Sequence, residues 1–288
     1  MQFEKEKRKE EALKLLTQKA TDVHLTYGQI ADKTGFSKRQ IIRWAEQLKE
    51  MNKSGELTSK SPLEVLDQLI SFQSVENQNN TTERYKKKAK LYSPLADLQD
   101  LLYIPSRHIN AALVDQLATN QYIDNSRNVM ITSATGCGKT FLACALGNNA
   151  CEHQYTVRYF TMAELLEGFR IAEARGKYVK FLRQLANTYL IIIDDFLLTS
   201  VTDRDVEYLY RLVDSKPLRN HPRSFIICSQ LMKDEMYTRL GVRSTSLADA
   251  IINRLVSKAY DLEIQGDSMR EMDITAELER IRAAQTIK

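Results

Sequence analysis

The chain has 288 residues, of which 43% are hydrophobic and 27% are charged, a composition that excludes disordered and fibrous proteins. No stretch reaches the ~18 to 20 consecutive apolar residues of a membrane span, and the first residues lack the apolar run of a secretion signal. We therefore expect a cytoplasmic protein with no membrane partner. Residues 1–92 hold 18 Lys and Arg against 13 Asp and Glu, or +5, whereas the remaining 196 hold 23 against 24, or −1. This excess is a weak indication of a polyanionic partner.

The four cysteines predict neither a metal site nor a disulfide framework. No two of them form a CxxC pair, and their spacing matches no zinc motif. We expect reduced thiols at Cys137, Cys144, Cys151 and Cys228.

Residues 1–51 form a predominantly helical segment that contains a helix-turn-helix pattern between positions 26 and 48. Two capping boxes, one starting at Thr26 and one at Ser37, lie eleven residues apart, and Gly35 stands where a left-handed turn residue is required. The inward face is predicted to consist of Ile30, Ala31, Phe36, Ile41 and Trp44.

The second helix of this pattern presents side chains that suit DNA recognition. Hydroxyl, amide and cationic donors on one helix can contact phosphates and base edges in a major groove. The alternative is a small helical domain whose basic face is solvated or binds protein. The predicted DNA-binding residues are Ser37, Lys38, Arg39, Gln40 and Arg43.

Residues 52–90 are predicted to link this module to a second domain. An apolar-periodic stretch near 63–70 predicts one short helix, and the polar run 76–82 has the composition of a flexible linker. The basic residues between Arg84 and Lys90 fit phosphate contact and plain solvation equally well.

From about residue 91 onward, short apolar runs alternate with amphipathic stretches, which predicts an α/β domain over 91–273 followed by a helical tail at 274–288. The run at 190–193 has no polar alternation and predicts a central strand buried on both faces. A capping box from Thr161 to Glu164 predicts a helix over 162–174, with Gly176 as its stop. Strands are expected at 128–132, 156–160, 189–193, 224–228 and 260–264.

The most specific motif connects a predicted strand directly to a helical run, which is the context of a phosphate-binding loop. Glycines let successive N–H groups turn toward phosphate oxygens, and the helix N-terminus adds positive partial charge. Lys139 would reach the β- and γ-phosphates of ATP, and the Thr140 hydroxyl would bind Mg²⁺. The loop consists of Ser133, Ala134, Thr135, Gly136, Cys137, Gly138, Lys139 and Thr140.

Ser133 occupies the position where this motif normally begins with glycine. If the position requires a positive φ, serine would strain the loop by about 1 kcal/mol or more. The alternative reading of the motif is an ordinary strand-to-helix turn that contains glycine, lysine and threonine.

Two carboxylates at the end of the buried strand strengthen the prediction of a nucleotide site. Asp194 can hold Mg²⁺ through water, and Asp195 can orient and deprotonate an attacking water, although paired acids can also merely end a strand. Ser229 and Gln230 end a neighbouring strand and can contact the γ-phosphate or the water.

Two arginines are further candidates for the catalytic site. Arg254 lies in an apolar helical stretch and can form a surface ion pair or reach the nucleotide of a neighbouring subunit. Arg270 can reach the γ-phosphate within its own subunit. Solvated surface positions remain the alternative for both.

Several ordered motifs between about 90 and 272 give the chain a specific family resemblance. The segments are GCGKTFLA at 136–143, FTMAEL at 160–165, IIIDD at 191–195, AIINRL at 250–255 and GDSMR at 266–270. This region resembles the AAA+ helper ATPases of the IstB type from insertion sequences and, more distantly, the DnaC helicase loaders. The family usually has glycine at the place of Ser133 and asparagine at the place of Gln230.

The resemblance implies a P-loop AAA+ sheet flanked by helices, with ATP-dependent assembly into oligomers on DNA. It implies that Asp195 is the catalytic acidic residue and that Ser229 or Gln230 is sensor 1. It also implies that Arg254 is the arginine finger and Arg270 is sensor 2.

The N-terminal helix-turn-helix instead resembles that of transposases, and IstB-type proteins do not usually carry one. We therefore expect an ATPase that binds double-stranded DNA, oligomerises through ATP-bridged interfaces and presents target DNA to a transposase, with hydrolysis taking the assembly apart. The alternatives are a DnaC-like helicase loader and a nucleotide-sensing DNA-binding regulator with weak turnover.

Overall fold

The computed structural model describes residues 2–21, 26–53, 62–217, 221–240, 245–266 and 268–269. The chain divides into two compact units, Met1–Asn80 and Thr81–Lys288. Within the described ranges, no helix is both long enough and apolar enough to cross a membrane. The predicted tail at 274–288 lies outside these residues.

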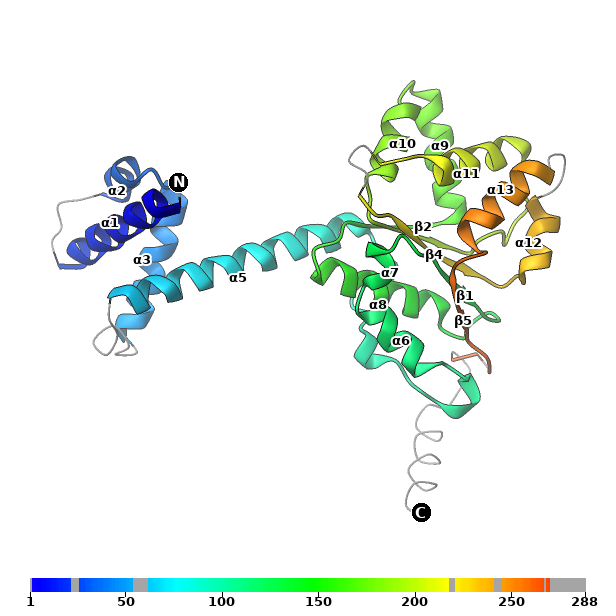
Figure 1. Cartoon of the computed structure of the whole chain (residues 1–288), viewed down its shortest axis with the longest axis horizontal. Helices are drawn as coiled ribbons and strands as arrows, with labels where there is room; N and C mark the ends of the chain where they lie inside the picture. Colours follow the sequence, from blue (N-terminus) through cyan, green and yellow to red (C-terminus); the bar gives the residue numbers. More distant parts are fainter. Residues whose placement is uncertain are drawn as a thin grey trace, which may run out of the picture. The chain divides into compact units, whose positions relative to one another are not determined.

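Up to residue 53, the described part of the N-terminal unit contains the helices α1 at Gln2–Thr21, α2 at Tyr27–Thr34 and α3 at Lys38–Lys53 (Figure 1). The predicted capping box at Thr26 is confirmed, and Gly35 ends α2 with a φ of 72°. At the start of α3, the Ser37 hydroxyl accepts a hydrogen bond from the Gln40 N–H over 3.3 Å. Local sequence signals therefore set both the turn and the start of the second helix.

A small apolar core holds these helices together. The predicted inward face is confirmed, because Ile30 and Ile41 are fully buried, Trp44 is 2% exposed and Phe36 packs against the cluster. The Phe36 and Trp44 rings meet edge to face with centroids 5.1 Å apart. The buried members of this core are Ala12, Leu13, Leu16, Ile30, Ala31, Ile41, Trp44, Ala45 and Met51.

The link between the units differs from the predicted short helix and flexible stretch. A single helix, α5, runs over Pro62–Ala89, and the boundary between the two units falls inside it. The polar residues at 76–82 have modest helix propensity, but the interior of α5 contains neither glycine nor proline to break it. The basic run from Arg84 to Lys88 continues the same helix, whereas Lys90 follows it with a φ of 54°.

The second unit contains a five-stranded parallel sheet in the order β2-β3-β4-β1-β5. Each predicted strand is present, with ends within one residue of the prediction. The four Ile and Leu residues of β3 are fully buried, which confirms the predicted central strand. The strands are β1 Val129–Thr132, β2 Val157–Thr161, β3 Leu190–Asp194, β4 Ser224–Ser229 and β5 Tyr260–Glu263.

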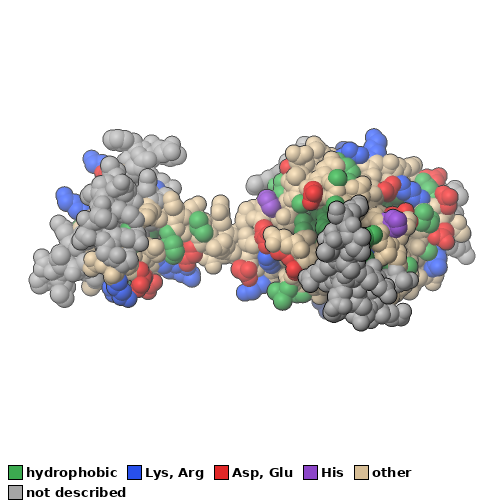
Figure 2. Space-filling model, turned by 90° about the horizontal axis from the view of Figure 1, so that it is seen from below, with side chains coloured by type: hydrophobic (Ala, Val, Ile, Leu, Met, Phe, Trp, Pro, Cys, Tyr) green, Lys and Arg blue, Asp and Glu red, His purple; other side chains and the backbone are tan. Residues whose placement is uncertain are grey.

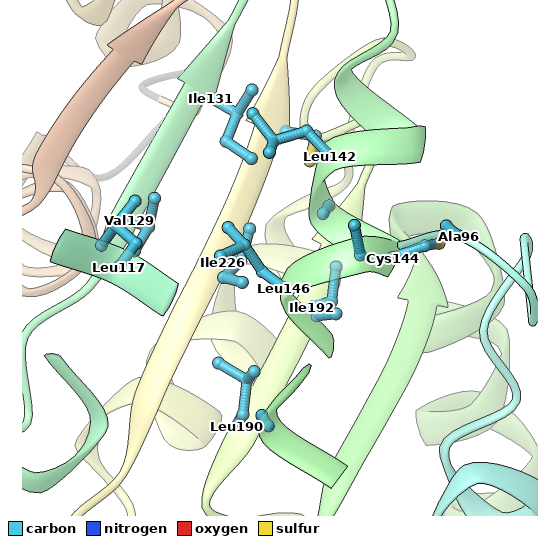
Figure 3. Packing of buried hydrophobic residues seen from close by; sticks show 14 of the residues in the cluster. Ala96, Leu117, Val129, Ile131, Leu142, Cys144, Leu146, Leu190, Ile192 and Ile226 are labelled. Atoms are coloured by element: carbon cyan, nitrogen blue, oxygen red, sulfur yellow. The ribbon is translucent and has the colours of Figure 1, made fainter. Parts of the chain in front are cut away.

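Helices cover both faces of this sheet, because alternate strand residues belong to two separate cores. On one face, Leu142, Cys144 and Leu146 of α8 pack over the strands, as Figure 3 shows. On the other face, Met130, Ile191 and Ile227 pack against the helices α9 to α13. The helices are α6 Ala111–Ala118, α7 Gln121–Asp124, α8 Lys139–Glu152, α9 Met162–Ala174, α10 Tyr178–Ala186, α11 Asp203–Asp214, α12 Lys233–Leu240 and α13 Thr245–Leu255, with 3-10 turns η1 Leu98–Asp100 and η2 Pro105–Arg107.

A candidate nucleotide-binding site

The loop at 133–140 directly follows β1 and runs into the first two residues of α8, at the carboxyl edge of the sheet. Gly136 and Gly138 adopt φ values of 84° and 93°, and Gly138 is the N-cap of α8. These left-handed residues turn the backbone so that loop N–H groups and the helix N-terminus can converge on an anion. The predicted strand, loop and helix are thus confirmed as one continuous unit.

Ser133 takes the first loop position without the strain considered above, because its φ is not positive. Its hydroxyl donates to the Ala134 carbonyl over 2.9 Å and accepts a hydrogen bond from Lys139 Nζ over 3.2 Å. A glycine could not provide this hydroxyl. Serine at this position therefore helps to hold the loop lysine.

Lys139 is 7% exposed, and its ammonium group lies along the first part of the loop. Nζ donates to the carbonyl oxygens of Ser133 and Ala134, each over 2.8 Å. Burial lowers the pKa of Lys139, while nearby cysteines and the Asp194 and Asp195 carboxylates act in the opposite direction. A partly desolvated cation at this point suits the binding of phosphate oxygens.

The Asp194 carboxylate ends β3 with 2% exposure. The Thr140 hydroxyl donates to its Oδ2 over 2.6 Å, and the Asp195 N–H donates to its Oδ1 over 2.9 Å. Within the part of the chain that the structure describes, no cluster of three His, Cys, Asp or Glu residues could hold a metal ion. A hydroxyl beside one carboxylate nevertheless fits Mg²⁺, which keeps water and substrate phosphates as its other ligands.

Asp195 directly follows β3 and is exposed toward the cleft, with a φ of 52°. Desolvation and the neighbouring Asp194 charge raise its pKa, and Lys139 opposes this shift. An accessible carboxylate with a raised pKa is suited to accept a proton from water.

Ser229 and Gln230, the two candidates for sensor 1 at the end of β4, have different surroundings. The Ser229 hydroxyl is fully buried, donates to the Phe196 carbonyl over 2.8 Å and accepts from the Leu231 N–H over 3.1 Å. It therefore holds the loop that follows Asp195. Gln230 lines the cleft, and its Oε1 accepts a hydrogen bond from the Thr135 hydroxyl over 3.0 Å.

These groups border a cleft of about 470 Å³. Sequence reasoning found its loop, its acidic residues and Gln230 but missed several other lining residues. Their hydrophobic and hydroxyl side chains gave no local signal of a site. The missed residues are Tyr92, Ser93, Phe141, Tyr159, Thr161 and Leu198.

Arg107 was also missed, although it supports the loop from a distant part of the sequence. Its side chain is 3% exposed, and Nη2 donates to the Cys137 carbonyl over 2.7 Å. Nη1 donates to the Leu102 carbonyl over 2.8 Å, and burial lowers the pKa of Arg107. A side chain on Gly138 would place its Cβ 2.9 Å from Nη2, so the glycine permits this close approach.

Of the two predicted arginines, the structure describes the position of Arg254. Arg254 does not line the nucleotide cleft of its own chain, and its Nη2 forms an ion pair with Asp214 Oδ1 over 3.0 Å. It borders a different cleft of about 710 Å³ that also includes Arg127, Arg223 and Lys258. Arg270 lies outside the described residues.

The segment just before Arg270 contacts the phosphate-binding loop. The Met269 N–H donates to the Gly136 carbonyl over 3.0 Å. A Cβ added to Gly136 would lie 2.2 Å from Ser268 Oγ. The structure thus brings residues 268–269 to the loop through tertiary packing.

In the N-terminal unit, the predicted DNA-binding residues occupy one end of α3. Ser37, Lys38 and Arg39 are exposed, whereas Gln40 and Arg43 are half-buried. Arg43 Nη2 lies 3.3 Å from Glu76 Oε1 of α5. On the described part of the face shown in Figure 2, Lys and Arg side chains lie beside Asp and Glu side chains.

The parallel sheet order, the glycine-rich loop before α8 and the acidic end of β3 define a P-loop nucleotide-binding protein with the AAA+ fold. The chain matches the IstB-like ATP binding protein family over residues 35–275 and belongs to that family.

Relatives from insertion sequences agree with this assignment. The chain is 31% identical over 193 residues to the insertion sequence ATP-binding protein y4uH of Sinorhizobium fredii, covering 67% of this chain and 75% of that protein. It is 37% identical over 149 residues to an ATP-binding protein of insertion sequence IS1162 from Pseudomonas fluorescens, covering 52% and 63%. The DnaI crystal structure shares the fold with a TM-score of 0.50 at 17% identity, covering 64% of this chain and 98% of that one.

Proposed function

We propose that this protein is an ATP-dependent, DNA-binding helper of transposition that oligomerises on target DNA and hands it to a transposase. One observation carries the proposal. Lys139, Thr140 and Asp194 line the same cleft, in a chain whose relatives are ATP-binding proteins of insertion sequences. That origin favours transposition over the loading of a helicase.

ATP hydrolysis is the proposed reaction of the cleft. The Asp195 carboxylate accepts a proton from water while the water oxygen bonds to the γ-phosphorus, and the bond from that phosphorus to the bridging oxygen of ADP breaks. Gln230 orients the water or the γ-phosphate from the end of β4. Mg²⁺, when bound, neutralises charge on the β- and γ-phosphate oxygens, and the residues that would hold it are Thr140 and Asp194.

The place of Arg254 supports action on the ATP of a second copy. The guanidinium lies outside its own nucleotide cleft and pairs with Asp214, at a second cleft that four cationic side chains line. Such a surface attracts the triphosphate of a neighbouring subunit. ATP then bridges two copies, and its hydrolysis removes the bridge, which takes the oligomer apart.

The N-terminal unit is the proposed DNA reader. Ser37, Lys38 and Arg39 lie exposed around the first turn of α3, where helix-turn-helix proteins contact base edges and phosphates. Arg43 and Gln40 belong to the same helix and complete the proposed set of DNA contacts. Arg270 is proposed to act as sensor 2 on the γ-phosphate of its own subunit.

Purified full-length chain and three variants test the catalytic proposal. Lys139→Ala should lose ATP binding, whereas Asp195→Asn should bind ATP and hydrolyse it slowly. Arg254→Ala should bind ATP but lose turnover, and mixing it with Lys139→Ala should restore part of the activity, because each chain supplies what the other lacks. Arg183→Ala, which removes an exposed arginine from α10, is the matched control.

Equal ATPase rates in the wild type, Lys139→Ala and Asp195→Asn would remove the hydrolysis proposal. An inactive mixture would remove the action of Arg254 between subunits. Cross-linking with and without ATP and duplex DNA, at stated salt, tests oligomerisation. Recovery of an integrase-type transposase in a pull-down supports the proposed partner, and recovery of a replicative helicase instead contradicts it.

A further inference from the structure

The Tyr159 hydroxyl lies in the nucleotide cleft and contacts the carboxylate proposed to hold magnesium. Tyr159 belongs to β2 and is 6% exposed, and its hydroxyl donates to Asp194 Oδ2 over 2.8 Å. A phenol hydroxyl keeps its proton at neutral pH, and the Asp194 carboxylate is the acceptor in this contact, so Tyr159 is the donor.

This contact completes the set of donors around Asp194. Oδ2 accepts from both Tyr159 and Thr140, over 2.8 and 2.6 Å, and Oδ1 accepts from the Asp195 N–H over 2.9 Å. A carboxylate oxygen accommodates about two in-plane hydrogen bonds. The two hydroxyls therefore fix the plane of the Asp194 carboxylate through Oδ2. They do not contact Oδ1, which can accept a hydrogen bond in addition to the one from the Asp195 N–H.

We propose that Tyr159 is a positioning residue for Mg²⁺, acting through Asp194. Its hydroxyl holds the carboxylate so that Oδ2 stays with the Thr140 hydroxyl while Oδ1 remains available to the hydration shell of the metal. The inference rests on the proposed magnesium site and adds a residue that neither the loop motif nor the acidic pair contains. Partners that orient a metal ligand typically change metal affinity or activity by about 10 to 100-fold when removed.

A purely structural role of Tyr159 and a role in positioning Mg²⁺ predict different results for Tyr159→Phe. The Tyr159 ring belongs to the core cluster on the α8 face of the sheet, and phenylalanine keeps that ring. Removing only the hydroxyl should therefore leave the fold and the metal-free binding of nucleotide in place. Only the response to Mg²⁺ should change.

The test uses the full chain, a fluorescent ATP analogue and Tyr159→Phe. Nucleotide affinity is measured first in EDTA and then at increasing Mg²⁺ concentration. The matched control is Tyr155→Phe, which also removes a tyrosine hydroxyl bonded to an aspartate over 2.8 Å, at Asp124, away from the cleft. We expect Tyr159→Phe to raise the Mg²⁺ concentration for half-maximal effect by about tenfold or more, with unchanged affinity in EDTA and no shift in the control.

A second comparison shows whether the effect passes through Asp194. In an Asp194→Asn background, adding Tyr159→Phe should produce no further shift in the Mg²⁺ response, because the two changes act on one unit. An unchanged Mg²⁺ response in Tyr159→Phe, or an equal loss of affinity with and without the metal, overturns the inference. A wild type that binds nucleotide with no response to Mg²⁺ overturns instead the proposed magnesium site on which the inference rests.

Discussion

Replacing Gly136 with alanine should reveal how tightly Ser268 and Met269 pack on the phosphate-binding loop. Two costs add at this position. The φ of 84° is left-handed, and alanine there costs roughly 1–2 kcal/mol. The new Cβ would also lie 2.2 Å from Ser268 Oγ and 2.9 Å from Ser268 Cβ, an overlap that typically costs about 1–3 kcal/mol. We expect a total loss of about 2–5 kcal/mol in the free energy of unfolding.

Gly176→Ala isolates the first cost. This glycine has a φ of 63°, but a Cβ there meets no atom within 4 Å, so only the backbone cost of roughly 1–2 kcal/mol applies. Ser268→Gly removes the overlapping atoms and leaves Ser268 Cα, 3.3 Å from the new Cβ, as the nearest contact. In that background, Gly136→Ala should cost about as much as Gly176→Ala.

Urea unfolding followed by far-UV circular dichroism measures each variant, with Ser268→Gly alone closing the double-mutant cycle. ATP affinity should fall in Gly136→Ala and recover in the double variant, because the segment that leads to Arg270 returns to the loop. Equal losses in Gly136→Ala and Gly176→Ala would refute the reasoning. The absence of any rescue by Ser268→Gly would show that the overlap is relieved elsewhere.

Three further predictions concern Ser133, Asp195 and Arg39. Ser133→Gly should not improve ATP binding in nucleotide titrations, because it removes the hydroxyl that accepts from Lys139 and relieves no left-handed backbone. Asp195→Asn should raise the midpoint of thermal unfolding at neutral pH. The pKa of Asp195 is higher in the folded chain than in the unfolded chain, so the charged carboxylate destabilises the fold. This destabilisation is absent below about pH 3.8 and grows as the pH rises through the folded pKa. A gain that persists at low pH would contradict this. Arg39→Ala should weaken duplex DNA binding and reduce the slope of log affinity against log salt concentration by about one. Lys14→Ala, which removes an exposed lysine from α1, should change neither quantity. Identical DNA titrations for the two variants would exclude Arg39 from the DNA contact.

The sequence alone predicted the elements whose signals are local. Strands were recognisable because short apolar runs must be buried, and the confirmed caps at Thr26 and Thr161 satisfy backbone groups of their own helices. The phosphate-binding loop was equally readable, because its glycines, Lys139 and Thr140 stand within eight consecutive positions. The polar composition at 76–82 misled the prediction, since composition describes average propensity and the segment lies in a helix without a breaker.

Tertiary structure decided which distant side chains meet in the cleft. Tyr159 reaches Asp194 because β2 pairs with β3 in a register that places Tyr159 beside Ile192, two residues before the carboxylate. Arg107 reaches the loop from 30 positions away along the chain. At the end of β4, the turn after the strand buries Ser229 and directs Gln230 to the cleft. These contacts depend on the pairing and packing of several elements at once, and no local pattern encodes them, because the energy that selects them arises only when the sheet and its helices assemble.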